Sequence, residues 1–430
     1  MHRLVCVLVA CLVIVPGQRA VAEQSPEVTC TAKKTACVDR AEAGRFLARI
    51  FPTDTQMDDV YGGATALGRD IAVVGAPWDS ERAYRAGSVY VYRRAKDGAW
   101  NVVAKIFAPN PQSRAFFGSA VAIDDNAIVV GAPGVSKDAN ISTGAAYVFR
   151  IQDDGSVVPE TTLQRIDARA GDFFGASVAL NKGTVVIGSH LADGAAADSG
   201  AVYFFSRKDK DAVWVQSGSL QPDGLKAGTL FGSAISLGRD FLAVGAYGYD
   251  GSAPGGGGVY LYRRKGDNFV FHSLLEPPAR KAFAEFGWSV ALSGERLVIG
   301  SPYEDSGNPV TGTAYVFSFD PKKDQWTIQG RLTATGTIAQ ERFGASVAVD
   351  DGTVVVGAPF GFAFIFGFEA AKGWRPHNIF VGAMPMSDRL YSRAVAVAEG
   401  TVLIGVPNQA GGRDAAGSAY LFGLQNAVRR

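Results

Sequence analysis

The feature that most constrains this chain of 430 residues is a sevenfold internal repeat. Each copy opens with an aromatic residue followed by a small one, and a Gly stands fourteen residues after the aromatic. The seven aromatic and Gly pairs are Tyr61 and Gly75, Phe117 and Gly131, Phe174 and Gly188, Phe231 and Gly245, Phe286 and Gly300, Phe343 and Gly357, and Tyr391 and Gly405. The units recur every 48 to 57 residues, a period typical of propeller blades and too long for one solenoid coil.

Each unit is predicted to contain four strands. Ser119 to Ile123 and Ala127 to Val130 are short and rich in apolar and β-branched residues, and the turn Asp124-Asp125-Asn126 between them indicates a tight hairpin. A third strand follows a further Gly, as in Gly87 to Tyr92, and a fourth alternates apolar and polar residues, as in Trp100 to Phe107. The prediction is an all-β, seven-bladed β-propeller of four-stranded antiparallel blades.

The residue types indicate where each strand lies in such a ring. The first strand is rich in Gly, Ser and Ala, which suits the crowded axis. The second reads as a continuous apolar run, as in Ile128 to Val130, because neighbouring blades cover both of its faces. We expect the leading Phe of each unit to wedge between two blades.

The last unit has no outer strand before Arg430. The segment Phe46 to Phe51 precedes Tyr61 much as Val103 to Phe107 precedes Phe117. We therefore predict that Phe46 to Phe51 pairs with Ser418 to Phe422 and closes the ring, which removes an open sheet edge.

These signatures, such as Phe117-Gly118 and Gly131-Ala132-Pro133, resemble the FG-GAP repeats of integrin α N-terminal propellers and of short-hairpin bacterial surface proteins. The resemblance covers residues 46–430 and implies protein binding or cell adhesion. Many repeats of that family bind calcium through an Asp-rich loop between the first two strands. The turns here, such as Asp124-Asp125-Asn126, are too short and too poor in carboxylates for that, so we expect no metal and no cofactor.

The first 22 residues read as a signal peptide. Arg3 supplies a positive start, Leu4 to Val15 an apolar core, and Ala20-Val21-Ala22 a cleavage site. The apolar run is too short for a membrane span, and no later segment is long and apolar enough for one. We therefore expect a secreted protein that is extracellular, periplasmic or bound at the cell surface.

Residues 23–45 are expected to form a separate N-terminal segment that contains Cys30 and Cys37. In an oxidising compartment these two cysteines are predicted to form a disulfide. The alternative, half of a metal site, is disfavoured because no His or further Cys lies nearby.

The charges nearly cancel, with 42 Lys and Arg against 41 Asp and Glu. The basic field that non-specific nucleic-acid binding needs is absent, so we do not expect a nucleic-acid partner. We expect a monomer.

Ligand contacts are predicted on one face of the ring, where the loops between second and third strands meet the connections between blades. Tyr84, Tyr249 and Tyr303 offer stacking surfaces there for a sugar or a peptide, although ordinary solvated loop residues are the alternative for each candidate. The candidate residues are Asp79, Arg82, Tyr84, Asp138, His190, Asp193, Tyr249, Asp250, Tyr303, Glu304, Asp305, Arg413 and Asp414.

No catalytic set stands out in the sequence. His190 replaces Pro in one Gly-Ala-Pro signature, but no second His or Cys lies at ligand spacing. Asp54, Asp58 and Asp59 are either paired carboxylates or an ordinary polar turn.

The sequence favours a module that binds an extracellular protein or glycan. The alternatives are a carbohydrate-active or lipid-active enzyme that uses loop carboxylates, and a structural envelope protein.

Overall fold

The computed structural model describes residues 45–56, 58–137, 141–207, 213–266, 268–304, 311–334, 342–350, 352–358, 362–381, 394–407 and 416–424. The predicted signal peptide and the predicted Cys30–Cys37 disulfide lie outside the described residues.

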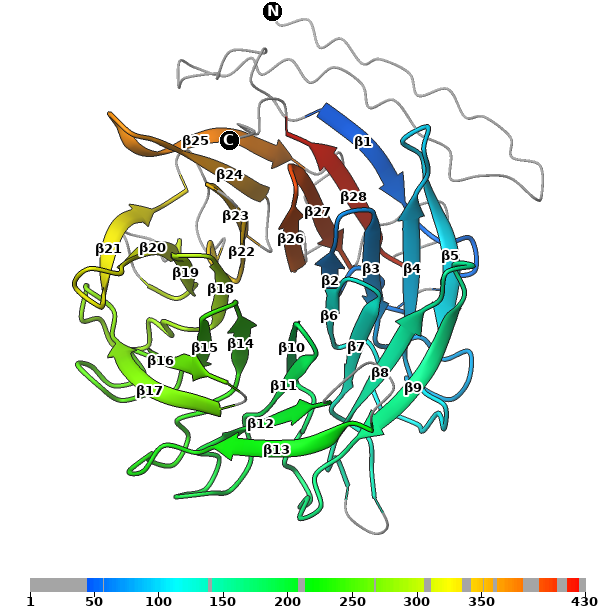
Figure 1. Ribbon diagram of the computed structural model, residues 1–430, viewed down its shortest axis with the longest axis horizontal. Helices are drawn as coiled ribbons and strands as arrows, with labels where there is room; N and C mark the ends of the chain where they lie inside the picture. Colours follow the sequence, from blue (N-terminus) through cyan, green and yellow to red (C-terminus); the bar gives the residue numbers. More distant parts are fainter. Residues whose placement is uncertain are drawn as a thin grey trace, which may run out of the picture.

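Within these residues, 28 strands form seven four-stranded antiparallel sheets set around one axis (Figure 1). This confirms the predicted seven-bladed propeller. Blade 1 comprises β2 (Ala64–Leu67), β3 (Ile71–Ala76), β4 (Ser88–Arg94) and β5 (Trp100–Ile106); blade 2, β6 (Ala120–Asp124), β7 (Ala127–Ala132), β8 (Ala145–Ile151) and β9 (Val157–Leu163); blade 3, β10 (Ser177–Asn181), β11 (Thr184–Ser189), β12 (Ala201–Ser206) and β13 (Val215–Leu220); blade 4, β14 (Ala234–Leu237), β15 (Phe241–Ala246), β16 (Gly258–Lys265) and β17 (Asn268–Leu275); blade 5, β18 (Ser289–Ser293), β19 (Arg296–Ser301), β20 (Thr313–Asp320) and β21 (Gln325–Leu332); blade 6, β22 (Ser346–Asp350), β23 (Thr353–Ala358), β24 (Phe362–Glu369) and β25 (Gly373–Val381); and blade 7, β26 (Ala394–Ala398), β27 (Thr401–Val406), β28 (Ser418–Gly423) and β1 (Arg45–Ile50).

The first strand of each blade contacts the first strands of both neighbouring blades, from β2 with β6 around to β26 with β2. These strands therefore form the inner ring, as their small residues predict. The second strands are buried along nearly their whole length, as in β7 and β27, because blades cover both of their faces.

Strand β1 closes the ring as predicted. It pairs antiparallel with β28, with Phe46 opposite Phe422 and Ile50 opposite Ala419, so the last blade takes its outer strand from the start of the propeller (Figure 1). Ile50 is fully buried, and the rings of Phe46 and Phe422 meet edge to face with centroids 5.8 Å apart. Phe51, which the prediction included, lies just past the end of the strand.

Hydrogen bonds of the backbone explain the repeated spacing. The Phe117 N–H donates to the Ala86 carbonyl of the preceding blade at 2.9 Å, and the Gly118 N–H donates to the Gly131 carbonyl of its own blade at 3.0 Å. Both bonds recur in each of the first six units. The bonds equivalent to the second run from Gly62 to Gly75, Gly175 to Gly188, Gly232 to Gly245, Gly287 to Gly300 and Gly344 to Gly357. The fixed offset between the two signatures therefore reflects a backbone contact that recurs in the six blades whose leading residues are described.

The Gly of the second signature is required by the close approach of the next blade. A Cβ atom added to Gly131 would lie 2.0 Å from the Gly175 carbonyl oxygen, a distance that no real side chain tolerates. A Cβ added to Gly405 would lie 2.1 Å from the Gly62 oxygen in the same way. Blade 7 therefore meets blade 1 through the same contact that joins the other blades.

The leading Phe does wedge between blades. Phe117 is fully buried in a cluster that contains Val89 and Val91 of blade 1 together with Ile128 and Val130 of blade 2. The leading aromatic is likewise fully buried in all six described copies. Burial of a Phe side chain stabilises a fold by about 1.5–3 kcal/mol.

Candidate functional site

Loops from neighbouring blades interlock on one face of the propeller, as predicted. The Arg114 N–H of the β5–β6 connection donates to the Tyr84 carbonyl of the β3–β4 loop at 2.7 Å. The Gly134 N–H of the β7–β8 loop donates to the Ala115 carbonyl at 3.1 Å. We call this the variable-loop face; the hairpin turns between first and second strands lie on the other face.

Two of the predicted site residues hold their loops onto the blade. Asp79 and Glu304 stand at the same repeat position, four residues after Gly75 and Gly300, and both are buried. Glu304 accepts hydrogen bonds from the Tyr315 hydroxyl at 2.7 and 2.8 Å and pairs with Arg331 at 3.0 Å. Tyr315 and Arg331 are cross-strand neighbours on β20 and β21, so the carboxylate ties the loop to the third and fourth strands.

In blade 1, the buried Asp79 carboxylate has a similar environment, with Lys105 in the role that Arg331 has in blade 5. The Asp79 carboxylate accepts a bond from the Ser88 hydroxyl at 2.6 Å, and the Lys105 ammonium lies 2.9 Å from it. The same ammonium contacts Asp54 at 2.9 Å and Glu81 at 2.7 Å. Burial alone would lower the pKa of Lys105, but hydrogen bonds to these carboxylates raise it above its ordinary value. The described residues contain no group of three or more His, Cys, Asp or Glu side chains that could hold a metal ion.

Asp59 lies beside this cluster and is itself almost fully buried. Burial raises its pKa to about 6, although the Gln56 N–H that donates to its carboxylate at 2.6 Å acts in the opposite direction. The nearby charges of Asp79 and Asp54 add to the rise, and Lys105 opposes it. The cluster therefore holds one carboxyl group that changes its charge near neutral pH.

An open group of aromatic and Arg side chains lies on the same face of blade 1. Trp78 is 37% exposed and Tyr84 is 52% exposed. The Arg85 guanidinium lies over both rings, 4.2 Å from the centre of Trp78 and 5.2 Å from that of Tyr84, and Arg114 lies 5.8 Å from the Tyr84 ring centre. We call Trp78, Tyr84, Arg85 and Arg114 the Trp78 patch. Of these four residues, the sequence analysis predicted only Tyr84. The presence of Trp78 on a variable loop could have indicated the patch from the sequence.

Arg82 and Tyr303 also lie on this face. The Arg82 guanidinium lies 4.7 Å from the centre of the Phe107 ring, and Arg342 lies 4.8 Å from that of Tyr303. Tyr249 is part-buried, with its ring centre 6.0 Å from that of Tyr260.

The other predicted residues in the described chain shape their own loops. Asp193 accepts the Asp198 N–H at 3.0 Å, and Asp250 accepts the Gly255 N–H at 2.7 Å. His190 is part-buried with its Nδ1 atom lacking a partner; burial lowers its pKa, and the charge of Asp198 opposes the shift. Asp138, Asp305, Arg413 and Asp414 lie outside the described residues. The ligand role predicted for the whole set stays a prediction.

The comparisons with known proteins agree with the repeat. Six segments match the FG-GAP repeat, at residues 45–92, 100–149, 159–205, 214–262, 275–317 and 326–362, which together exceed half of the chain. The chain belongs to the FG-GAP repeat family. The seventh copy falls outside the matched segments, yet β26, β27, β28 and β1 form its blade as a complete sheet of this FG-GAP propeller.

Solved structures also resemble this FG-GAP propeller. One of them is the crystal structure of Sqt1 from Saccharomyces cerevisiae, with 10% sequence identity and a TM-score of 0.48, covering 89% of this chain and 100% of that one. A search of curated proteins gave no match. In the described part of the chain, no helix is long and apolar enough to cross a membrane.

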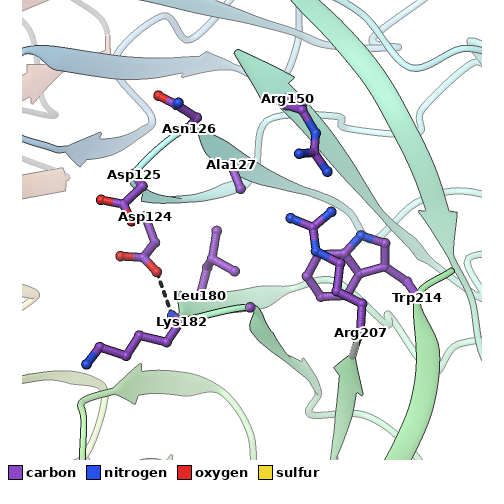
Figure 2. A pocket seen from close by; sticks show the side chains of 10 residues that line it. Asp124, Asp125, Asn126, Ala127, Arg150, Leu180, Lys182, Arg207 and Trp214 are labelled. Carbon is purple, nitrogen blue, oxygen red and sulfur yellow. Dashed lines mark hydrogen bonds between the residues drawn. The ribbon is translucent and has the colours of Figure 1, made fainter. Parts of the chain in front are cut away.

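A pocket lies on the opposite face of the FG-GAP propeller, between blades 2 and 3 (Figure 2). Its volume is about 310 Å³, and the turns around Asp125 and Lys182 line it together with Arg150, Arg207 and Trp214.

Glu160 links the basic groups of this pocket. It accepts hydrogen bonds from Arg150 at 3.0 Å, from the Trp214 indole at 2.6 Å and from Arg207. The Lys182 N–H donates to Asp124 at 2.6 Å (Figure 2). The ion pair of Arg207 with Glu160 and the backbone hydrogen bond from Lys182 to Asp124 join the two blades, so the pocket favours a structural role over ligand binding.

Proposed function

We propose that this FG-GAP propeller is a secreted or cell-envelope module that binds an extracellular protein or glycan through its variable-loop face. The family fold is typically that of a binding module, and the interlocked loops give a rigid surface for recognition. The observation that carries the proposal is the Trp78 patch, which we assign to a protein partner.

The composition of the Trp78 patch supports this assignment. Trp, Tyr and Arg are the residues most enriched among those that dominate the energy of protein interfaces. Here they stand together on loops that backbone hydrogen bonds already fix, so little conformational entropy is lost on binding. By contrast, the buried carboxylates Asp79 and Glu304 are engaged within their blades, which disfavours an enzyme that uses them.

Partner capture tests the proposal. The mature chain, residues 23–430, is immobilised and exposed to surface and secreted proteins of the producing organism and to a glycan array. The double variant Trp78→Ala/Tyr84→Ala is expected to weaken capture at least about tenfold, a loss of about 1.4 kcal/mol.

The matched control is Phe271→Ala, which removes an aromatic ring that is 55% exposed on the outer strand β17. This variant is expected to bind like the native protein. A partner that binds the Trp78→Ala/Tyr84→Ala variant as tightly as the native chain would show that the patch is not the contact surface.

A further inference from the structure

The internal repeat gives each position six or seven copies, so a departure from the common residue type stands out. The residue after the aromatic-Gly pair is small in five described blades, as Gly63, Ser119, Ala176, Ser233 and Ala345, whereas blade 5 has Trp288. The second residue after the next Gly is Pro in four described blades, as Pro77, Pro133, Pro302 and Pro407, whereas blade 3 has His190 and blade 4 has Tyr247. The residue before the aromatic is apolar in blades 1 to 4, as Val60, Phe116, Phe173 and Leu230, whereas blade 5 has Glu285 and blade 6 has Arg342.

These three departures come together in space. The ring centres of Tyr247 and Trp288 are 4.7 Å apart, and those of Trp288 and Tyr303 are 6.0 Å apart. The Trp288 N–H donates to the Glu285 carbonyl at 3.1 Å, so Glu285 belongs to the same turn as Trp288. Burial raises the pKa of Tyr247, and the Glu285 carboxylate adds to the rise. We call Tyr247, Glu285, Trp288 and Tyr303 the axial cluster.

The axial cluster lies near the propeller axis on the variable-loop face. Trp288 directly precedes Ser289, the first residue of β18, which is an inner-ring strand in contact with β14 and β22. All three aromatic side chains remain partly exposed. The fold does not require a large ring at this position, because small residues serve in the equivalent places of other blades.

Glu285 carries an oxygen atom that lacks a partner. Its Oε2 atom is buried without a hydrogen bond, which leaves a desolvated acceptor that a ligand donor would satisfy. Burial raises the pKa of Glu285, and the charge of Arg342 opposes the rise. The Arg342 guanidinium also lies over the Tyr303 ring, 4.8 Å from its centre.

We propose that the axial cluster binds a neutral saccharide. The C–H face of a sugar ring packs against Trp and Tyr rings, while a sugar hydroxyl donates to the unpaired Glu285 oxygen, which is buried in the unliganded chain and must become accessible on binding. A divalent cation fits less well because Glu285 is the only carboxylate of the cluster, and an anion is disfavoured by that same carboxylate. The site is distinct from the Trp78 patch on blade 1.

Ligand-observed NMR with a panel of neutral trisaccharides tests this inference. The probes are maltotriose, cellotriose, triacetylchitotriose, xylotriose and mannotriose, each mixed with the mature chain. At least one is expected to show saturation transfer to its ring C–H protons. Trp288→Ser, which restores the residue of blades 2 and 4, is expected to weaken that binding about tenfold or more while the fold is kept. Glu285→Gln tests the acceptor in the same assay.

The matched control is Phe271→Ala, which removes an exposed aromatic ring of the outer strand β17 outside both patches and is expected to leave saccharide binding unchanged. Absence of binding by every trisaccharide, or equal binding by Trp288→Ser with an unchanged melting temperature, would overturn the inference. Capture of a protein through the Trp78 patch without saccharide binding would refute the axial site alone and leave the proposed function standing.

Discussion

Single residues in this propeller adopt conformations that the repeat imposes on every blade. The residue before each leading aromatic has a positive φ in all six described copies, between 52° and 60°, although none is Gly; these residues are Val60, Phe116, Phe173, Leu230, Glu285 and Arg342. Such a backbone costs about 1–2 kcal/mol per residue, and the contacts of the next residues in the ring offset it. The side chain is free to vary because the backbone alone fixes the turn.

Asp59 should make the stability of the protein depend on pH. Its pKa is about 6 in the folded chain against an ordinary value of 3.8, so the folded state binds the proton more tightly. This contribution is fully present below pH 3.8 and is lost as the pH rises through 6, a loss of about 2–3 kcal/mol for this group. Asp59→Asn is therefore expected to unfold at higher denaturant concentration than the native chain at pH 7.

Chemical denaturation at pH 4, 5, 6 and 7 measures this effect. The gain from Asp59→Asn should shrink toward pH 4, where the native carboxyl is protonated. Asp70→Asn, a change at an exposed residue, serves as the control and should leave the pH profile as it is. A native chain and an Asp59→Asn variant with parallel pH profiles would contradict the assignment.

At the scale of elements, side-chain hydrogen bonds and ion pairs anchor the loops between second and third strands to their blades. In blade 5 this is done by Glu304 with Tyr315 and Arg331, and in blade 1 by Asp79 with Ser88 and Lys105. Sequence analysis placed Asp79 and Glu304 on the variable-loop face but treated them as candidate ligand contacts. Their burial depends on the third and fourth strands, which no local pattern around these residues reveals.

Glu304→Ala is expected to destabilise the chain by about 2–3 kcal/mol, because it leaves the buried Tyr315 hydroxyl without its acceptor. Glu304→Gln keeps an acceptor in place and should cost less. Thermal and chemical unfolding measure both variants. Asp250→Ala, at an exposed residue of the corresponding loop in blade 4, is the control, and an equal effect of Asp250→Ala and Glu304→Ala would argue against the anchoring role.

At the scale of the whole molecule, the ring is closed by β1. This strand joins the start of the propeller to β28, and the Arg49 guanidinium donates to the Ser418 hydroxyl at 3.0 and 3.2 Å across the junction. Without β1, the outer edge of β28 would present unpaired backbone groups, which promote association between chains.

A mature chain that lacks residues 23–50 is expected to melt at lower temperature and to associate as its concentration rises. The matched control lacks residues 23–44 and keeps β1, so it should remain closed. Light scattering coupled to size-exclusion chromatography, together with thermal unfolding, distinguishes the two. Equal stability and equal size of both truncated chains would refute closure by β1.

The amino-acid sequence by itself determined the number of blades, the four-stranded unit and the closing strand. These follow from the spacing of glycines and aromatics, because each Gly marks a backbone contact that recurs in register along the chain. The β1–β28 pairing was predictable for the same reason, since Phe46 to Phe51 repeats the pattern that precedes each other blade.

Only the tertiary structure decided which loop residues are available to a ligand. Asp79 and Glu304 are buried by strands of their own blades, whereas Trp78 and Tyr84 stay open and gather Arg85 and Arg114 around them. Likewise, Tyr247 and Trp288 come from different blades and meet only when the ring forms. The physical reason is that exposure and side-chain contacts in a propeller depend on neighbouring strands and blades, and these lie tens of residues away in the sequence.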